Sequence, residues 1–339
     1  MVKDLTEVRS LQRKHMPDTV GSGILMPTSL RGIVNTAKVD PQHRFRDLYR
    51  LMNLDMLYLA WKDLKKNAAI ADDDITVKEY EADLSTNLEG LADRLKRKKY
   101  RAKLIKRKYI PKDNGKKRPL GIPALEDKIV QKAAAKILES IYEPEFLDCS
   151  YGYRPGRGAK DAVSDLTFQL QFGVFGYIVE ADIKGYFDNI DHDKLLEMMA
   201  ERIDDRAFLG LIRKWLKAGI LEPEGYVKHP VTGTPQGGLV SPILSNIYLH
   251  KVLDEWFETE VKSRLKGRAI LCGYADDWVC AFQYRDDARR FFKVLPKRLT
   301  RFGLEIAPDK TKILRFSRFH PSRKRGRTFE FLGFEFYWN

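Results

Sequence analysis

Short apolar runs alternate with polar turns over the C-terminal half of the chain. Residues 269–274 and 278–282 are two such runs, and Asp276 and Asp277 lie between them. Runs of this length predict two strands joined by a tight turn. Two carboxylates about 4 Å apart repel one another by roughly 4 kcal/mol at an effective dielectric constant near 20. A proton, a basic neighbour or a metal ion must offset this cost, although Asp is also common in purely structural turns.

A second apolar run also ends in an acid. Residues 177–181 predict a strand that closes on Asp182, and a helix is predicted to begin near His192 with Asp191 as its N-cap. Asp182 could simply end the strand. However, a carboxylate from this strand and the pair 276–277 can together hold two hard cations about 3.5 to 4 Å apart. The pattern therefore predicts two-metal catalysis, in which one ion activates an attacking hydroxyl and the other stabilises a leaving pyrophosphate.

Helical periodicity is prominent in the first part of the chain. Residues 44–61 carry apolar side chains near the helical spacing, and residues 127–138 predict an amphipathic helix. From Tyr177 onward short strands alternate with helices, which favours an α+β fold with a small, mainly antiparallel sheet backed by helices. A chain of 339 residues can bury a substantial core and form two or three subdomains. We expect three regions, over residues 1–90, 91–176 and 177–339.

Basic residues are concentrated between positions 95 and 118, where Tyr100 and Tyr109 are interleaved with them. The whole chain has 61 Lys and Arg against 47 Asp and Glu, a formal charge of +14. Such a protein is expected to bind a polyanion, most simply a nucleic acid, and to lose affinity as salt rises. A solvated surface or a nuclear-localisation tract would have the same composition. Residues 109–120 predict a hairpin with a cationic tip.

Other classes of protein are disfavoured. No apolar stretch approaches the roughly 18 residues of a membrane helix, and the first residues lack the apolar centre of a signal peptide. We therefore expect a cytoplasmic protein that associates with nucleic acid and not with a membrane. Cys149, Cys272 and Cys280 lack the spacing of a metal site and are expected to be small core residues. The six histidines are scattered, so no zinc site is predicted.

Six segments together resemble a known family. Three resemble, in order and spacing, the core motifs of reverse transcriptases: ADIKGYFDNI at 181–190, GTPQGGLVSP at 233–242 and YADD at 274–277. Three more are similar to motifs of the group II intron-encoded proteins, also called maturases: RPLGIP at 118–123, SYGYRPGRG at 150–158 and FLGF at 331–334. One such motif can arise by chance, but six in the right order are not expected to. The similarity extends over roughly residues 27–339.

The resemblance implies the fingers and palm of a right-hand polymerase. Residues 1–90 would form a helical N-terminal extension and the start of the fingers, residues 91–176 the fingers, and residues 177–339 the palm with its antiparallel sheet. The helical thumb of such enzymes is expected to be absent, because the sequence stops at Asn339. Polymerisation is then expected to be weak or distributive.

The resemblance also implies the activity of an RNA-directed DNA polymerase, a nucleotidyltransferase of a retroelement that extends a primer 3′-hydroxyl. The implied cofactors are two Mg²⁺ ions, with Mn²⁺ as a substitute, and the implied partners are intron RNA, template RNA, a DNA primer and a deoxynucleoside triphosphate. Binding of intron RNA implies a role in splicing.

Two alternatives remain open at this point: an RNA-binding splicing cofactor with little polymerase activity, and a polymerase that accepts ribonucleotides. The sequence does not decide which RNA is bound, whether the source is a mobile intron, a CRISPR-associated cassette or a domesticated copy, or whether the protein is a dimer.

Residue roles follow from the same resemblance. The implied catalytic and metal-binding groups are the carboxylates of Asp182, Asp276 and Asp277 and the backbone carbonyl of Ile183. The implied nucleotide contacts are Lys112, Arg118, Phe187, Gln236 and Lys310. Within this set, Phe187 would be an aromatic wall against a ribose 2′-hydroxyl, and Lys310 would lie near the pyrophosphate, with Lys312 as the reserve. The implied template and primer contacts are Arg154, Arg157, Pro235, Gly237, Leu332 and Gly333. A surface turn explains the two arginines nearly as well, and a core position is the commoner role for an aromatic residue such as Phe187.

Overall fold

The computed structural model describes the backbone of residues 19–20 and 24–25 and all of residues 28–64, 76–111, 117–317 and 328–338. The chain forms two compact units, each assembled from separate stretches of sequence. The first unit contains residues 1–25, 146–186 and 248–339, and the second contains residues 26–145 and 187–247. The chain therefore crosses between the units several times. The region borders expected at residues 90 and 176 stay predictions.

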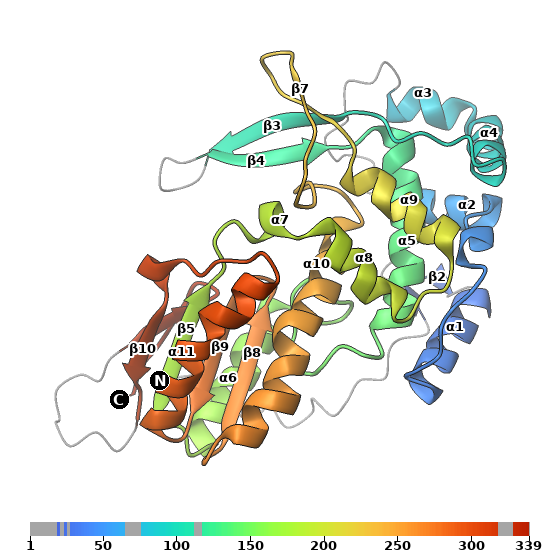
Figure 1. Cartoon of the computed structure of the whole chain (residues 1–339). Helices are drawn as coiled ribbons and strands as arrows, with labels where there is room; N and C mark the ends of the chain where they lie inside the picture. The colour runs from blue at the N-terminus through green and yellow to red at the C-terminus, as the bar shows by residue number, and fades with distance from the viewer. Residues whose placement is uncertain are drawn as a thin grey trace. The chain divides into compact units, whose positions relative to one another are not determined.

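A four-stranded antiparallel sheet is the centre of the first unit, with the strand order β10-β5-β9-β8. The strands span Tyr177–Asp182 (β5), Ala269–Tyr274 (β8), Asp277–Phe282 (β9) and Lys312–Arg315 (β10). β8 and β9 form the tight hairpin predicted from the two apolar runs, and β5 pairs with β9 from the other side. Figure 1 shows α11 on one face of this sheet and α6 on the other.

Both faces of the sheet are buried under apolar side chains. On one face Ile178 and Ala281 pack with Leu166 of α6 (Ala159–Phe172). On the other face Phe282 contacts Phe291 of α11 (Arg285–Arg301), with 5.3 Å between the ring centroids. The central strands are therefore apolar on both sides, except at Glu180 of β5 and where the strands end. The expected α+β fold with an antiparallel sheet backed by helices is confirmed.

Smaller elements complete the first unit. The hairpin of β11 and β12 contributes three phenylalanines to the core that α6 covers. Residues after α10 continue in wide, π-helical turns before β8 begins. These elements span Thr19–Val20 (β1), Ile24–Leu25 (β2), His250–Asp254 (η3), Phe257–Val261 (η4), Lys262–Arg264 (η5), Pro308–Lys310 (η6), Phe329–Phe331 (β11) and Phe334–Phe336 (β12).

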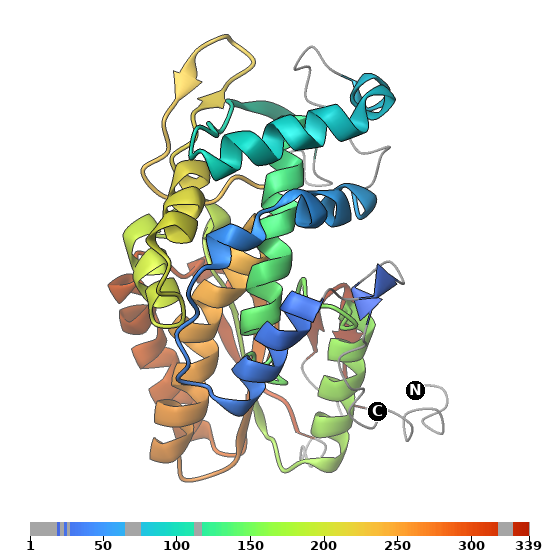
Figure 2. The same cartoon turned by 90° about the vertical axis from the view of Figure 1, so that its right-hand side faces the viewer.

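A long helix, α5 (Leu125–Tyr142), is the centre of the second unit and confirms the helix predicted over 127–138. Figure 2 shows α1 and α2 against it, and both contact it. The run Ala133–Ala135 is buried in the core of this unit. Lys136 of α5 is fully buried and is neutralised by Asp63.

Four of the other helices in the second unit, α2, α3, α8 and α9, begin with a side-chain cap. Thr76 and Glu79 form a capping box at α3, and Asp191 accepts hydrogen bonds from the backbone amides of Asp193 and Lys194 at the start of α8, as predicted. Along the sequence, one border between the units falls within α7 and another within α10. The helices span Thr28–Val39 (α1), Leu48–Leu51 (η2), Leu54–Lys62 (α2), Val77–Ala82 (α3), Leu84–Lys96 (α4), Tyr186–Asn189 (α7), His192–Ala200 (α8), Arg206–Leu216 (α9) and Ser241–Leu249 (α10).

A second four-stranded sheet has the order β4-β3-β6-β7. Its strands span Ile105–Pro111 (β3), Lys117–Ile122 (β4), Ile220–Leu221 (β6) and Val227–Lys228 (β7). The antiparallel pairing of β3 with β4 confirms the predicted basic hairpin, and Tyr109 of β3 donates a hydrogen bond to buried Glu222 at 3.0 Å. The hairpin tip, which includes Lys112, lies outside the described residues. In the part of the chain described, no helix is long and apolar enough to cross a membrane.

Candidate active site

Two acids that are distant in sequence lie opposite one another at one end of the first unit's sheet. Asp182, the last residue of β5, is the direct cross-strand partner of Asp277, the first residue of β9. Directly opposed residues project to the same face, with Cβ atoms about 4.5 to 5.5 Å apart. Asp276 precedes Asp277 in the turn between β8 and β9. The register of the sheet therefore gathers the three predicted carboxylates at one strand end.

The acidic turn is supported by the segment just before α6. The amide of Tyr151 donates to the carbonyl oxygen of Gly273 at 2.9 Å, and the amide of Gly273 donates to that of Cys149 at 2.8 Å. A Cβ atom on Gly152 would overlap the backbone nitrogen of Ala275 and lie 3.0 Å from the carbonyl carbon of Tyr274. Glycine is therefore required at position 152 for the two backbones to meet. Ala275 itself has φ 55°, a left-handed conformation that costs a non-glycine residue free energy.

A lysine neutralises part of the acidic charge. The Nζ atom of Lys310 lies 2.8 Å from Oδ2 of Asp182. Its hydrogen bond to Asp182 and the negative charges of Asp182, Asp277 and Asp276 raise the pKa of Lys310. The pKa of Asp277 is raised as well, because surrounding protein atoms reduce its hydration and because Asp182 carries a like charge. One ammonium group thus stands within the field of all three carboxylates.

The two lysines considered for the pyrophosphate have different surroundings. Lys312 lies across from Glu180 in the β10–β5 pair, and its Nζ atom is 2.8 Å from Oε2 of that buried acid. Glu180 also accepts a hydrogen bond from the amide of Glu330 at 3.2 Å. Lys312 therefore stabilises the sheet interior, whereas Lys310 reaches the strand end. A contact of Lys310 with the pyrophosphate stays a prediction.

The donor set at this strand end fits hard divalent cations. Among the described residues, no group of three or more His, Cys, Asp or Glu side chains is already arranged around a common metal position. However, all the donors are oxygen atoms, the type that Mg²⁺ prefers, and an ammonium group already stands beside them as a cation. The bridge between Ile183 and Ile306 uses the carbonyl of Asp182 and the amide of Lys184. That bridge leaves the carbonyl of Ile183 unused, so it can serve as a further ligand.

Three of the five residues predicted to contact the nucleotide, Arg118, Phe187 and Gln236, lie in the second unit, whereas Lys310 belongs to the first unit and Lys112 lies outside the described residues. The carbonyl oxygen of Gln236 accepts a hydrogen bond from the amide of Gly121 at 2.6 Å, which joins the Gln236 loop to the strand of Arg118. Gly237 has φ 112°, and a Cβ atom there would overlap the carbonyl oxygen of Gly121. Glycine is therefore needed at 237 for both its conformation and its close packing. Arg118 is exposed on β4, three residues before Gly121.

The same loop also binds the backbone around Phe187. The amide of Thr234 donates to the carbonyl oxygen of Phe187 at 2.8 Å, and Gly233 lies too close to that segment to carry a side chain. The carbonyl oxygen of Pro235 accepts a hydrogen bond from Oγ of Ser241 at 2.9 Å, which fixes the other end of the loop. Phe187 is buried, with 7% of its surface exposed. The structure thus brings Arg118, Gln236 and Phe187 to neighbouring segments.

The two arginines predicted to contact the template stabilise their own loop. Arg154 is buried, and its guanidinium donates to the carbonyl oxygens of Leu147 and Ser150, both at 2.7 Å. Arg157 is ion-paired with Asp148 at 2.5 Å. Because the guanidinium of Arg154 is enclosed by protein carbonyls, the structure does not support a template contact for this residue. Both arginines bind backbone or side-chain groups of the loop that contains Gly152. The alternative, a surface turn, did not predict the burial of Arg154.

The predicted primer hairpin is present as a two-residue turn. Phe331 pairs with Phe334, and the residues between them, Leu332 and Gly333, have φ values of 53° and 79°. Two successive left-handed residues are typical of the tight turns that match strand twist. Leu332 packs against the core of the first unit, and the Gly333 backbone is exposed. A close approach of another molecule to Gly333 is sterically allowed, and its contact with a primer stays a prediction.

Three important residues were missed in the sequence analysis. Gly152 allows the backbone contact described above, Gly121 leaves no space for a side chain beside Ile105, and Glu180 is the buried acid that forms an ion pair with Lys312. Gly152 and Gly121 lie inside segments already recognised as motifs, so a glycine within a motif was the available signal. Glu180 carried a weaker signal, an acid at an interior position of an apolar strand.

Comparison with known proteins identifies similar sequences. The family described as "Reverse transcriptase (RNA-dependent DNA polymerase)" matches residues 110–336. The chain is 43% identical over 210 residues to the group II intron-encoded protein LtrA of Lactococcus lactis subsp. cremoris, covering 61% of this chain and 35% of that protein. It is 34% identical to protein YkfC of Escherichia coli K12 over 283 residues, 74% of each chain. The chain thus spans about a third of the length of LtrA. These matches confirm the resemblance stated above.

Among solved structures, an apo telomerase from Candida tropicalis has a similar fold. The TM-score is 0.52 at 16% sequence identity, and the match covers 69% of this chain and 53% of the telomerase. At this level of identity the similarity supports the fold alone. The polymerase-like fold expected from the sequence is consistent with it.

Proposed function

Because this chain belongs to the reverse transcriptase (RNA-dependent DNA polymerase) family, we propose that it is the catalytic core of an RNA-directed DNA polymerase of the group II intron-encoded type. The observation that carries this proposal is the direct pairing of Asp182 with Asp277, with Asp276 beside them. Stability of the fold does not explain three neighbouring acids at one strand end, because like charges repel one another. The proposed partners are an RNA template, a primer with a free 3′-hydroxyl and deoxynucleoside triphosphates.

The proposed reaction is attack of the primer 3′-hydroxyl on the α-phosphate of the incoming nucleotide, with pyrophosphate leaving. Two Mg²⁺ ions, held by Asp182, Asp276, Asp277 and the Ile183 carbonyl, would supply activation of the hydroxyl and charge stabilisation on the phosphates. Mn²⁺ has the same preference for oxygen ligands. The sheet register and the contact at Gly152 hold the carboxylates in place before substrate binds. Preorganised charge of this kind requires little rearrangement during the reaction.

The chain's own cations would act on the phosphates. The raised pKa of Lys310 keeps its ammonium protonated at neutral pH, so it can stabilise the leaving pyrophosphate or donate a proton to it. Arg118 presents a planar guanidinium that can bind two phosphate oxygens at once. The side chain of Gln236, whose backbone is fixed on Gly121, is proposed to contact the nucleotide. Lys112, next to this hairpin's tip, stays a sequence-based candidate.

Phe187 is proposed to set the preference for deoxynucleotides. Its backbone is fixed by the hydrogen bond from Thr234, and its ring is buried, so the ring cannot move aside without loss of packing. A rigid aromatic wall next to the sugar would clash with a 2′-hydroxyl. The alternative that the enzyme accepts ribonucleotides predicts equal incorporation of both sugars.

The test is primer extension on an RNA template with Mg²⁺ and deoxynucleoside triphosphates. Asp276→Asn should lower extension by roughly 10³-fold or more, because loss of a metal-binding charge removes several kcal/mol of transition-state stabilisation. The matched control is Asp286→Asn, an exposed acid in the first turn of α11. RNA affinity should be the same for both variants. Extension by Asp276→Asn at the wild-type rate would refute the assignment.

Binding of intron RNA is proposed as a second property of the same chain. The exposed cations of β3 and β4 and the similarity to an intron-encoded protein support it. The Asp276→Asn variant separates the two properties, since splicing of an intron RNA in vitro does not require DNA synthesis. Splicing by this variant together with no extension by the wild type would instead favour the role of a pure splicing cofactor.

A further inference from the structure

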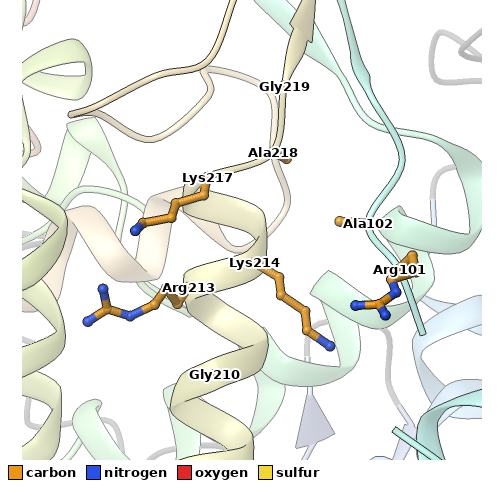
Figure 3. Close-up of a pocket in the computed structure, with 8 residues that line it drawn as sticks. All are labelled: Arg101, Ala102, Gly210, Arg213, Lys214, Lys217, Ala218 and Gly219. Atoms are coloured by element: carbon orange, nitrogen blue, oxygen red, sulfur yellow. The ribbon is translucent and has the colours of Figure 1, made fainter. Parts of the chain in front are cut away.

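A cationic hollow lies in the second unit, away from the residues assigned above. Its volume is about 460 Å³, and it lies between the last turns of α9 and the segment that leads into β3. Four of its eight lining residues are basic, and the other four are alanine or glycine. Figure 3 shows the basic side chains around α9. They are Arg101, Arg213, Lys214 and Lys217.

The hollow carries more positive charge than its surroundings neutralise. Arg213 is paired with Asp193 at 2.8 Å, but both side chains are largely exposed. The Nζ atom of Lys214 donates to the carbonyl oxygen of Tyr100 at 3.3 Å, which leaves its charge uncompensated. Arg101 and Lys217 are exposed and have no acidic partner among the described residues. In Figure 3 Lys214 and Arg101 extend toward one another although both are cations. An anion between them would remove this repulsion.

The two sides of the hollow are fixed to one another by a buried network. Nε1 of Trp215, on α9, donates to the hydroxyl of Tyr100 at 3.0 Å, and that hydroxyl bonds to the buried carboxyl of Asp127. The amide of Lys103 donates to the same carboxyl at 2.9 Å. The amide of Ile105 donates to the carbonyl oxygen of Gly219 at 2.9 Å. The cations are therefore presented by a rigid frame and not by a mobile loop.

One lining residue has no explanation within the fold. Gly210 lies inside α9, where glycine is destabilising relative to alanine. A Cβ atom at this position would meet nothing within 4 Å, so no neighbouring element requires glycine there. By contrast, a Cβ atom at Gly219 would lie 2.8 Å from side-chain atoms of Leu104 and Val227, so that packing with neighbours accounts for glycine at this position. Absence of a side chain at 210 leaves the hollow open to close approach by a ligand.

We propose that this hollow binds phosphate groups of an RNA backbone, at a site separate from the nucleotide and metal positions. This proposal rests on the proposed function for its partner, an RNA. Cations come from both α9 and the segment before β3, as a polymer with successive phosphates requires, and Gly210 leaves space for a sugar-phosphate chain. Phosphate contacts of this kind position a nucleic acid without reading its sequence.

The first test removes charge from the hollow. In Arg101→Gln/Lys217→Gln, the plot of log affinity for a structured RNA against log salt should become shallower by roughly 0.7 to 0.9 for each phosphate that the protein no longer neutralises. The matched control is Arg289→Gln/Lys293→Gln, which removes the same charge from exposed positions of α11. The control should keep the wild-type slope. Equal slopes for both double variants would overturn the proposal, since net charge alone would then explain the binding.

The second test fills the hollow without changing charge. Gly210→Gln places a long neutral side chain on a surface with free space and should weaken RNA binding several-fold. Gly210→Ala should leave RNA binding unchanged, because a single methyl group fits and favours the helix. Wild-type affinity in Gly210→Gln would contradict the proposal. Competition of RNA binding by free triphosphate that disappears in the double variant would show that the hollow is a nucleotide site and would also overturn it.

These measurements are independent of catalysis. If the wild type binds RNA but does not extend a primer, the proposed polymerase activity fails while the salt slopes still test the hollow. If the wild type extends a primer and the salt slopes of the two double variants are the same, only the proposed phosphate site in the hollow is refuted.

Discussion

The acidic site of the first unit and the cationic surfaces of the second unit are built in different ways. In the first unit three carboxylates are placed by strand register, and the turn that holds two of them touches the backbone of Gly152. In the second unit many lysines and arginines lie exposed to solvent. The acids depend on positions accurate to a fraction of an ångström, whereas the cations act through their summed charge. Single substitutions at the acids or at their backbone contact should therefore have large effects, and single substitutions of exposed cations without a defined role should have small effects.

Among the substitutions that keep all three carboxylates, the largest effect is expected from Gly152→Ala. The new Cβ atom would overlap the backbone nitrogen of Ala275, so the acidic turn must shift. A displacement of about 1 Å at reacting groups can lower the rate roughly 10²-fold. We expect kcat for primer extension to fall by that factor, with RNA affinity unchanged. Single-turnover extension and RNA binding, measured together, check both statements.

The control for this prediction lies in the same loop. In Gly158→Ala the new Cβ atom would meet only a carboxylate oxygen of Asp161, at 3.6 Å, an ordinary contact. This variant should retain kcat. If Gly152→Ala also retains wild-type kcat, the turn does not depend on this contact, and the contrast between a positional and a summed-charge site is weakened.

A cation with a defined role should behave differently from its neighbours, and Arg118 is the test case. Loss of one charged hydrogen bond to a phosphate costs about 1.5 to 3 kcal/mol, so Arg118→Gln should raise KM for the deoxynucleotide roughly tenfold or more. Successive strand residues point to opposite faces, so Lys117→Gln removes an exposed cation from the other face of β4. Steady-state kinetics at varied deoxynucleotide concentration should show an unchanged KM for Lys117→Gln. Equal KM changes in both variants would show that Arg118 acts only through the summed positive charge of the surface.

Local patterns predicted the elements that carry these two sites. The hairpin around Asp276 and Asp277, the strand that ends at Asp182 and the helix over 127–138 depend on short-range periodicity, and each is present. The basic hairpin is present for the same reason.

Features that depend on long-range packing could not be predicted in this way. The direct pairing of Asp182 with Asp277, rather than with a neighbour, follows from sheet register, which a single sequence does not encode locally. The burial of Arg154 depends on carbonyl groups of its own loop, which become convergent only when the loop folds. The division into two interleaved units could not be predicted for the same reason: β5 joins one sheet with β8, β9 and β10, which follow it only after a long stretch of sequence.

The smallest effect is expected at Lys310, the one cation described within the acidic cluster, and it joins the two kinds of site. Its side chain is 70% exposed, and an exposed ion pair contributes about 0.2 to 1 kcal/mol. Lys310→Gln should therefore raise the affinity of the site for Mn²⁺ by up to roughly fivefold, because the ion no longer competes with an ammonium group for Asp182. Titration calorimetry measures this without any substrate. The control, Lys312→Gln, removes a lysine whose partner is Glu180 and should leave Mn²⁺ affinity unchanged.

At saturating metal the same Lys310→Gln variant should extend primers more slowly, because it lacks the charge proposed to stabilise the leaving pyrophosphate. Tighter metal binding combined with slower extension distinguishes a lysine that acts on the substrate from one that only neutralises the carboxylates, and weaker metal binding in Lys310→Gln would contradict both roles.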